Sequence, residues 1–275
     1  MAVTMADITH LRKMSGAGMM DCKKALEEAD NDFEKAMEII RKKGQAVAAK
    51  RSDREASEGC VLAADKDGFA AVVALKCETD FVAKNAGFIE LTQSILDIAM
   101  ATKPASLQAL LATPLADGRP IENHITDRVG VTGEKMELGF YEFVKGESTV
   151  SYIHPGNKLA TVVAFNEKVE DHQVAREIAM QVAAMNPVAV REEEVPQHII
   201  DTEKEIARDK AREAGKQENL LDRIAEGALQ KFYKENTLLH QEFIKDSKLT
   251  VGQYLKQYSK NLTVVAFKRV TLNVD

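Results

Sequence analysis

The chain has 275 residues, with 37 basic and 43 acidic side chains, a net charge of −6 and 45% hydrophobic residues. At roughly 150 residues per domain, this length predicts about two domains with a substantial core and excludes a fibrous or disordered chain. The acidic balance argues against a protein that coats nucleic acid phosphates, so no nucleic acid partner is expected.

The N-terminus lacks the basic start and apolar stretch of a signal peptide, and no segment reaches the roughly 18 apolar residues of a membrane span. Cys22, Cys60 and Cys77 are widely separated and form no CxxC pair. This pattern favours reduced, packed thiols over disulfides or a zinc site. We therefore expect a cytoplasmic protein without membrane attachment.

Residues 1–55 are predicted to form a module of three short helices and a linker. Thr4 and Asp7 resemble a capping box, and Gly16 interrupts the pattern after the first helix. Apolar residues at i, i+3, i+4 and i+7 mark the next two helices, at Cys22, Ala25, Leu26 and Ala29 and at Phe33, Ala36, Met37 and Ile40. Gly44 is expected to end the third helix, and residues 45–57 to form a basic linker that is either helical or flexible. About 45 residues hold too little apolar area for high stability, so the module is expected to dock on the rest of the chain.

Residues 56–146 are predicted to form a first α+β subdomain. Strands over 60–64 and 69–77 flank a turn that ends in Gly68, which is typical of a hairpin. A helix over 88–102, a short helix from Pro104, a helix around Ile125 and a strand over 136–145 follow.

Residues 147–275 are predicted to form a second, similar subdomain. Strands over 149–154 and 158–166 form its hairpin, and a helix follows from Asp171 to Asn186. The strings Val72–Leu75 and Val162–Phe165 occupy matching hairpin strands, while Val264–Phe267 is expected to be a closing strand. A projecting helical hairpin is predicted at about 196–235, and a helix over 250–259 followed by a strand over 262–272 forms a C-terminal module at about 250–275.

Catalytic motifs are absent from the sequence. There is no GxxxxGK[ST] loop, GxGxxG, GxSxG or HExxH, and the six histidines are scattered. We therefore expect neither an enzyme nor a bound cofactor or metal.

Two places suggest a protein contact instead. Met20 falls about 160° around its helix from Cys22, off the apolar face, and Met19 sits at the edge of that face. Met20 is either one isolated exposed side chain or, with Arg12 and Lys23 nearby, part of a partner contact.

The second place is the segment Thr79-Asp80-Phe81-Val82, between a strand and a helix. One interpretation is a helix cap at Thr79 or Asp80 with Phe81 packed beneath it. The other is a loop whose aromatic ring wedges into another protein. The spacing alone leaves both open.

Longer strings carry a family resemblance. LRKMSGAGMMDCKKAL at 11–26, KKG at 42–44, CETDFVAKN at 77–85 and LLHQEFIKDSKLTV at 238–251 resemble bacterial elongation factor Ts closely. Tyr152-Ile153-His154 and Val182-Ala183-Ala184 with Pro187 are similar to the family as well. After His154 the chain reads Pro155-Gly156-Asn157, where the family usually has a glycine-rich turn.

The resemblance implies a guanine nucleotide exchange factor for the GTPase elongation factor Tu, which binds the GDP-bound and nucleotide-free forms and promotes GDP release so that GTP can rebind during translation elongation. It implies a ubiquitin-associated (UBA)-like N-terminal bundle, two similar α+β subdomains with antiparallel strands and an inserted coiled-coil hairpin. It also implies three sets of contact residues: Arg12, Met19, Met20 and Lys23 toward the GTPase domain; Thr79, Asp80, Phe81 and Val82 for dislodging Mg²⁺ from the partner; and His154 in the C-terminal half.

Other functions and assemblies stay open at this point. A UBA-like adaptor without exchange activity is the alternative function, while an enzyme using Asp80 and His154 lacks any positioned partner group. A dimer of the factor–GTPase complex is a further possible assembly.

Overall fold

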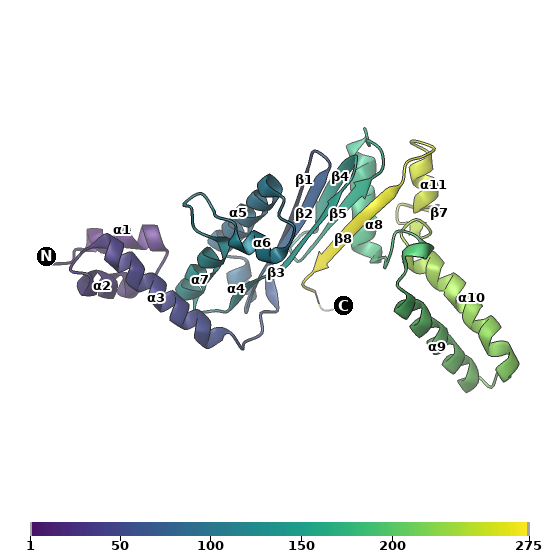
Figure 1. The fold of residues 1–275 in the computed structure, drawn as a ribbon, viewed down its shortest axis with the longest axis horizontal. Helices are drawn as coiled ribbons and strands as arrows, with labels where there is room; N and C mark the ends of the chain where they lie inside the picture. Colours follow the sequence, from purple (N-terminus) through teal and green to yellow (C-terminus); the bar gives the residue numbers. More distant parts are fainter. Residues whose placement is uncertain (1, 274–275) are drawn as a thin grey trace.

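The computed structural model describes residues 2–273, and the three predicted N-terminal helices are confirmed (Figure 1). They are α1 (Met5–Ser15), α2 (Met19–Glu28) and α3 (Phe33–Arg51). The Thr4 N–H donates to the Asp7 carboxylate at 2.9 Å and the Asp7 N–H donates to the Thr4 hydroxyl at 3.2 Å, which confirms the capping box. The module encloses its own small core, with Leu11 and Leu26 fully buried.

The third helix differs from its prediction, because α3 passes through Gly44 and continues to Arg51. Gly44 packs against Gly130 of α7 (Ile121–Thr132), where a Cβ on Gly130 would lie 2.6 Å from the Gly44 Cα. The glycine therefore permits a close helix crossing instead of ending the helix. Most of the expected linker is helical, and the module docks on the core through α3.

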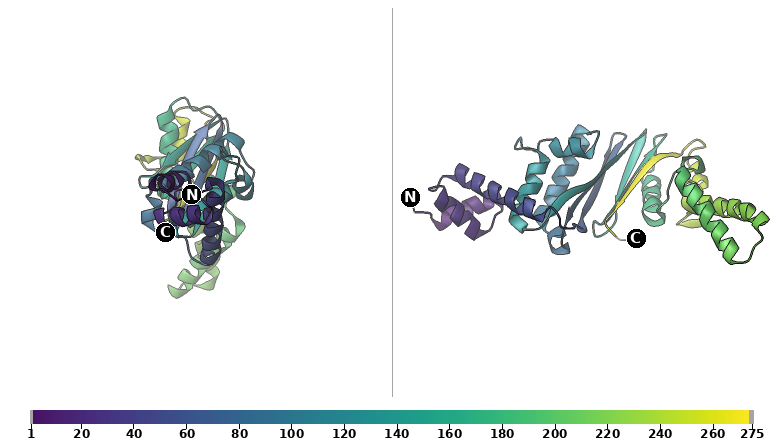
Figure 2. Two further views of the ribbon diagram at one scale, coloured as in Figure 1. Left: turned by 90° about the vertical axis from the view of Figure 1, so that its left-hand side faces the viewer. Right: turned by 60° about the horizontal axis from the view of Figure 1, so that its bottom comes forward.

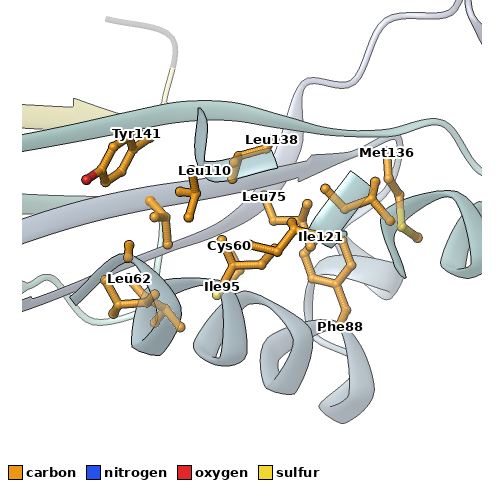
Figure 3. Packing of buried hydrophobic residues seen from close by; sticks show 14 of the residues in the cluster. Cys60, Leu62, Leu75, Phe88, Ile95, Leu110, Ile121, Met136, Leu138 and Tyr141 are labelled. Atoms are coloured by element: carbon orange, nitrogen blue, oxygen red, sulfur yellow. The ribbon is translucent and has the colours of Figure 1, made fainter. Parts of the chain in front are cut away.

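The first sheet has the order β1-β2-β3 and is antiparallel throughout. Its strands are β1 (Glu58–Lys66), β2 (Phe69–Cys77) and β3 (Met136–Lys145). Gly68 has φ 71° in the predicted hairpin turn. The helices of this half are α4 (Asp80–Ala83), α5 (Ala86–Thr102), α6 (Leu107–Ala112) and α7. Figure 3 shows Phe88 and Ile95 of α5 packed toward Leu75 of β2.

The second sheet has the order β4-β5-β8 and repeats the arrangement. Its strands are β4 (Ser148–Ile153), β5 (Leu159–Phe165) and β8 (Val264–Thr271). The predicted closing strand is thus confirmed as β8. Helix α8 (His172–Met185), capped by Asp171, covers the outer face of this sheet.

The two sheets face each other between layers of helices (Figures 1 and 2). On β2, Val73 and Leu75 face the helices of the first half, while Val72 and Ala74 face the other sheet. The matching residues of β5 divide in the same way. Small side chains between the sheets and larger ones under the helices therefore explain the repeated string.

A helical hairpin projects from the second half, as the sequence predicted (Figure 2). It consists of α9 (Gln197–Glu213) and α10 (Glu218–Asn236), and a 3₁₀ turn (Glu192–Glu194) precedes it. The last part contains β6 (Glu242–Phe243), β7 (Asp246–Thr250) and α11 (Val251–Lys256). The sequence did not predict β6 and β7, because two paired residues are too short for a periodic signal.

Two helix boundaries also differ from prediction. Helix α6 starts after Ser106, whose hydroxyl accepts from the Ala109 N–H, and not at Pro104. Helix α11 ends at Lys256, short of Ser259. Within residues 2–273, no helix combines the length and apolar character needed to cross a membrane.

Candidate partner-binding site

The loop after β2 carries a capped turn of helix, as one interpretation of the sequence predicted. Thr79 is the N-cap of α4, and its hydroxyl accepts from the Val82 N–H at 3.4 Å. Val82 and Ala83 turn toward the core of the first half. The predicted helix cap at Thr79 is therefore confirmed, but it does not determine whether the Phe81 ring is buried or exposed.

Phe81 is not packed beneath that cap. Its side chain is 84% exposed, compared with 63% for Met20. The alternative that buried Phe81 under α4 is therefore wrong. Full burial of a phenylalanine is worth about 1.5–3 kcal/mol, and this free energy stays available for contact with another molecule.

A carboxylate from the connection between α7 and β3 holds the start of the loop. The Thr79 N–H donates to Glu134 Oε2 at 3.0 Å, and the Thr79 hydroxyl donates to Glu134 Oε1 at 2.6 Å. The last pair of the β2–β3 ladder is Cys77 with Met136, so Thr79 lies two residues after the end of β2 and Glu134 two residues before the start of β3. Side-chain bonds therefore continue the pairing where the backbone ladder stops.

Glu78, directly after β2, strengthens the same junction from the side opposite Glu134. Its carboxylate accepts from the Lys135 N–H at 2.7 Å and from Arg54 Nη1 at 3.0 Å, and Arg51 lies 3.6 Å away. The Lys135 N–H bond and the Arg54 contact hold the pKa of Glu78 below its ordinary value, although partial burial opposes them. The loop is thereby tied to the end of α3.

Asp80 faces solvent next to Phe81. Lys84 Nζ lies 2.6 Å from Asp80 Oδ2, and this hydrogen bond is the main cause that lowers the pKa of Asp80. The positive charge of Lys158 lowers it further. Asp80 is therefore an exposed anion beside an exposed aromatic ring.

His154 lies in the turn that joins β4 to β5, and its side chain is exposed. The Tyr152 hydroxyl is 3.0 Å from His154 Nδ1, which fixes the ring. Lys158 of the same turn pairs with Glu58 at the start of β1 at 2.7 Å. Glu58 is paired with Cys77 at the end of β2, so the turn with His154 and the loop with Phe81 lie at the same end of the sheets.

The four N-terminal candidates form a separate surface on α1 and α2. Met19 and Met20 are 40% and 63% exposed, while Arg12 and Lys23 are exposed beside them in the sequence. Lys23 makes a long ion pair with Glu27, at 3.7 Å between exposed side chains. This surface is separated from the Phe81 loop by α3 and α7 (Figure 1).

The sequence did not reveal Glu134 as part of the site. It follows Gly133, the left-handed C-cap of α7, where no periodic pattern applies. Its position opposite Thr79 could have been found only from the register of β2 against β3. In the described residues, no group of three His, Cys, Asp or Glu side chains is placed to hold a metal ion.

The site is thus one exposed aromatic ring on a loop that is held by hydrogen bonds and flanked by charges. This geometry suits docking onto another macromolecule and does not enclose a small substrate. The fold and the site therefore define a partner-binding protein.

Comparison with known proteins gives the family. The family model for elongation factor Ts matches residues 78–273. An elongation factor Ts of Porphyromonas gingivalis is 78% identical over 275 residues, and one of Azobacteroides pseudotrichonymphae is 54% identical, each covering all of both chains. One of Bacteroides fragilis is 47% identical over an alignment of 332 positions that covers both chains fully. The chain belongs to the elongation factor Ts family, and it is a nucleotide exchange factor for elongation factor Tu in translation elongation.

Proposed function

We propose that the loop Thr79-Asp80-Phe81-Val82 drives exchange by inserting Phe81 beside the metal and phosphate site of elongation factor Tu and displacing its Mg²⁺. The observation that carries this proposal is the 84% exposure of Phe81 on a loop held by Glu134 and Glu78. Asp80 competes for hydrogen bonds of the partner at the same place. The chain changes a binding equilibrium and makes or breaks no covalent bond.

A comparison of binding free energies shows that the Phe81 loop alone cannot account for nucleotide exchange. A factor that weakens GDP binding about 10⁴-fold needs about 5.5 kcal/mol of differential binding. Phe81 supplies about 1.5–3 kcal/mol at most. We therefore assign the remaining binding free energy to two anchoring surfaces: Arg12, Met19, Met20 and Lys23 toward the GTPase domain, and His154 in the second half.

Exchange by this route requires that the factor and GDP each weaken the binding of the other to elongation factor Tu. A factor that prefers the rearranged phosphate loops weakens GDP by the same factor by which GDP weakens the complex. The protein therefore binds GDP-bound elongation factor Tu transiently and the nucleotide-free form tightly, in the cytoplasm where translation takes place. The family assignment favours this function over the general adaptor.

The test is stopped-flow release of fluorescent GDP from elongation factor Tu. We expect Phe81→Ala to lower the maximal release rate about 10- to 100-fold, the equivalent of about 1.4–2.7 kcal/mol, and Asp80→Ala to lower it less. Phe140→Ala is the matched control, because this ring is also exposed (40%) but lies on β3. If the folded Phe81→Ala and Asp80→Ala variants both release GDP at the wild-type rate, the proposal is wrong and the loop serves only as a helix cap.

The assembly of the complex is a separate part of the proposal. We propose that two factor–GTPase complexes associate into a dimer. Light scattering of the nucleotide-free complex tests this, because a dimer has twice the mass of a 1:1 complex. A mass equal to one copy of each chain at micromolar concentration would contradict it.

A further inference from the structure

The Phe81 loop is short and gains no packing from its ring, so other contacts must fix its conformation. Helix α4 has only 4 residues, and an isolated turn of helix is unstable in water. The Lys84–Asp80 pair is exposed, at 75% and 43% of the two side chains, and such pairs add little stability. The contacts that are shielded from solvent are of two kinds: Val82 and Ala83 pack against the core at the end of the loop, and hydrogen bonds to Thr79 and Glu78 hold its start.

Glu134 is built to hold Thr79. Each of its two carboxylate oxygens accepts one hydrogen bond from Thr79, at 3.0 Å from the N–H and 2.6 Å from the hydroxyl. Hydrogen bonds to an ionised acceptor are about twice as strong as neutral ones. The Glu134 backbone is itself fixed, because its N–H donates to the Thr132 hydroxyl at 3.2 Å at the end of α7. One rigid element therefore sets the direction in which the loop leaves β2.

We propose that Glu134 is a positioning residue for nucleotide exchange, which fixes the loop so that Phe81 is presented to elongation factor Tu before the two proteins meet. This inference rests on the proposed function of Phe81. Its physical basis is preorganisation, because a loop that must be ordered during binding spends part of the interaction free energy on that ordering. Glu134 then acts on exchange only through Phe81.

A double-mutant cycle tests this dependence. GDP release is measured across a range of factor concentrations for wild type, Glu134→Ala, Phe81→Ala and the double variant. We expect Glu134→Ala to lower the maximal rate about tenfold, the size expected when hydrogen bonds to a charged group are lost, with the half-saturating concentration nearly unchanged. In the Phe81→Ala background, the same change should cost less than about twofold.

Two further variants sharpen the result. Glu134→Gln keeps one acceptor oxygen, so it should restore an intermediate rate. Glu137→Ala is the matched control, because Glu137 lies on β3 three residues after Glu134, its carboxylate is 3.3 Å from Lys76 and 3.4 Å from Lys135, and it makes no hydrogen bond to Thr79. It should release GDP at the wild-type rate.

The outcomes separate this inference from the proposed function. If Phe81→Ala slows GDP release and folded Glu134→Ala does not, the positioning role of Glu134 is overturned, while the proposed insertion of Phe81 is retained. An equal loss from Glu134→Ala with and without Phe81 overturns it as well, because that result describes a general structural role. Wild-type release by Phe81→Ala overturns the proposed function itself. Should Glu134→Ala fail to fold, the cycle is run with Glu134→Gln under the same criteria.

Discussion

The Tyr254 hydroxyl donates to Glu177 Oε2 at 2.5 Å, which joins α11 to α8 inside the second half of the molecule. Lys245 Nζ and Gln173 Nε2 both lie within hydrogen-bond distance of Oε1, at 2.7 and 3.0 Å. Burial alone would raise the pKa of Glu177, but these three hydrogen bonds outweigh it and hold the pKa below the ordinary value of 4.5. The carboxylate therefore fastens α11 to α8.

This network predicts a pH-dependent stability. Because the pKa of Glu177 is lower in the folded than in the unfolded state, its ionised form stabilises the fold above pH 4.5 and this contribution is lost as the pH falls through the folded-state value. We expect Glu177→Gln to lose about 1–3 kcal/mol of unfolding free energy at pH 7. The difference from wild type should shrink as the pH falls below 4.5 toward the lowered pKa of the folded state.

Urea unfolding followed by circular dichroism at several pH values measures both quantities. Glu170→Gln is the control, because that carboxylate is 80% exposed and pairs with Lys168 at the surface. A deficit of Glu177→Gln that stays constant from pH 7 to pH 3 would show that its charge does not matter.

The crossing of α3 over α7 predicts an asymmetric response to alanine. A Cβ on Gly130 would lie 2.6 Å from the Gly44 Cα, whereas a Cβ on Gly44 would lie 3.4 Å from the Gly130 Cα. Overpacking costs about 1–3 kcal/mol, and alanine gains up to about 1 kcal/mol in a helix interior. Gly130→Ala should therefore weaken the contact by about 1–2 kcal/mol, and Gly44→Ala should be close to neutral.

Hydrogen exchange of the α3 amides reports directly on this crossing. Faster exchange in Gly130→Ala than in Gly44→Ala is the expected result. Gly227→Ala on α10 is the control, since nothing lies within 4 Å of its added Cβ and it should be stabilising. Equal protection of α3 in both crossing variants would contradict the steric argument.

The N-terminal surface predicts a binding defect without a stability defect. Met20 and Met5 are almost equally exposed, at 63% and 62%, but only Met20 belongs to the proposed contact. We expect Met20→Ala to raise the half-saturating concentration for GDP release about 3- to 10-fold, from the loss of part of a buried methionine contact. Met5→Ala should leave it unchanged, and both variants should melt like wild type. Similar effects of the two substitutions on the half-saturating concentration would rule out a specific role for Met20.

Much of this architecture could be predicted from the sequence, because its signals are local. The capping box at Thr4, the hairpin turn at Gly68 and the repeated string at Val72 and Val162 each depend on neighbours along the chain. Gly44 was misinterpreted because a glycine that admits a second helix and a glycine that ends a helix look alike until the partner is known.

The candidate site was harder to predict for the same physical reason. Spacing located the Thr79 cap, but it could not decide whether Phe81 was buried, since that depends on what the rest of the fold places beneath α4. Glu134 was missed because it meets Thr79 only through the register of two strands separated by a long segment. Tertiary pairing, not local preference, builds the junction that holds the loop.

The thiols beside this junction give a last prediction. Burial raises the pKa of Cys60 to about 11, and burial together with the negative charge of Glu134 raises the pKa of Cys77 to about 12. The thiolate fraction at pH 8 is then on the order of 10⁻³ or less. A short pulse of iodoacetamide at pH 8 should leave both unmodified in the native protein and alkylate both in guanidinium.

Mass spectrometry resolves the two sites, because tryptic cleavage at Lys66 and Lys76 places Cys60 and Cys77 on different peptides. Glu134→Ala removes the nearby charge and releases the loop to whose Thr79 carbonyl the Cys77 thiol donates at 3.2 Å. Cys77 should therefore react faster in that variant, while Cys60 serves as the internal control and stays protected. Rapid alkylation of Cys77 in the native wild-type protein would mean that the junction of β2 with the Phe81 loop opens readily, against the rigidity inferred from the Glu134 contacts.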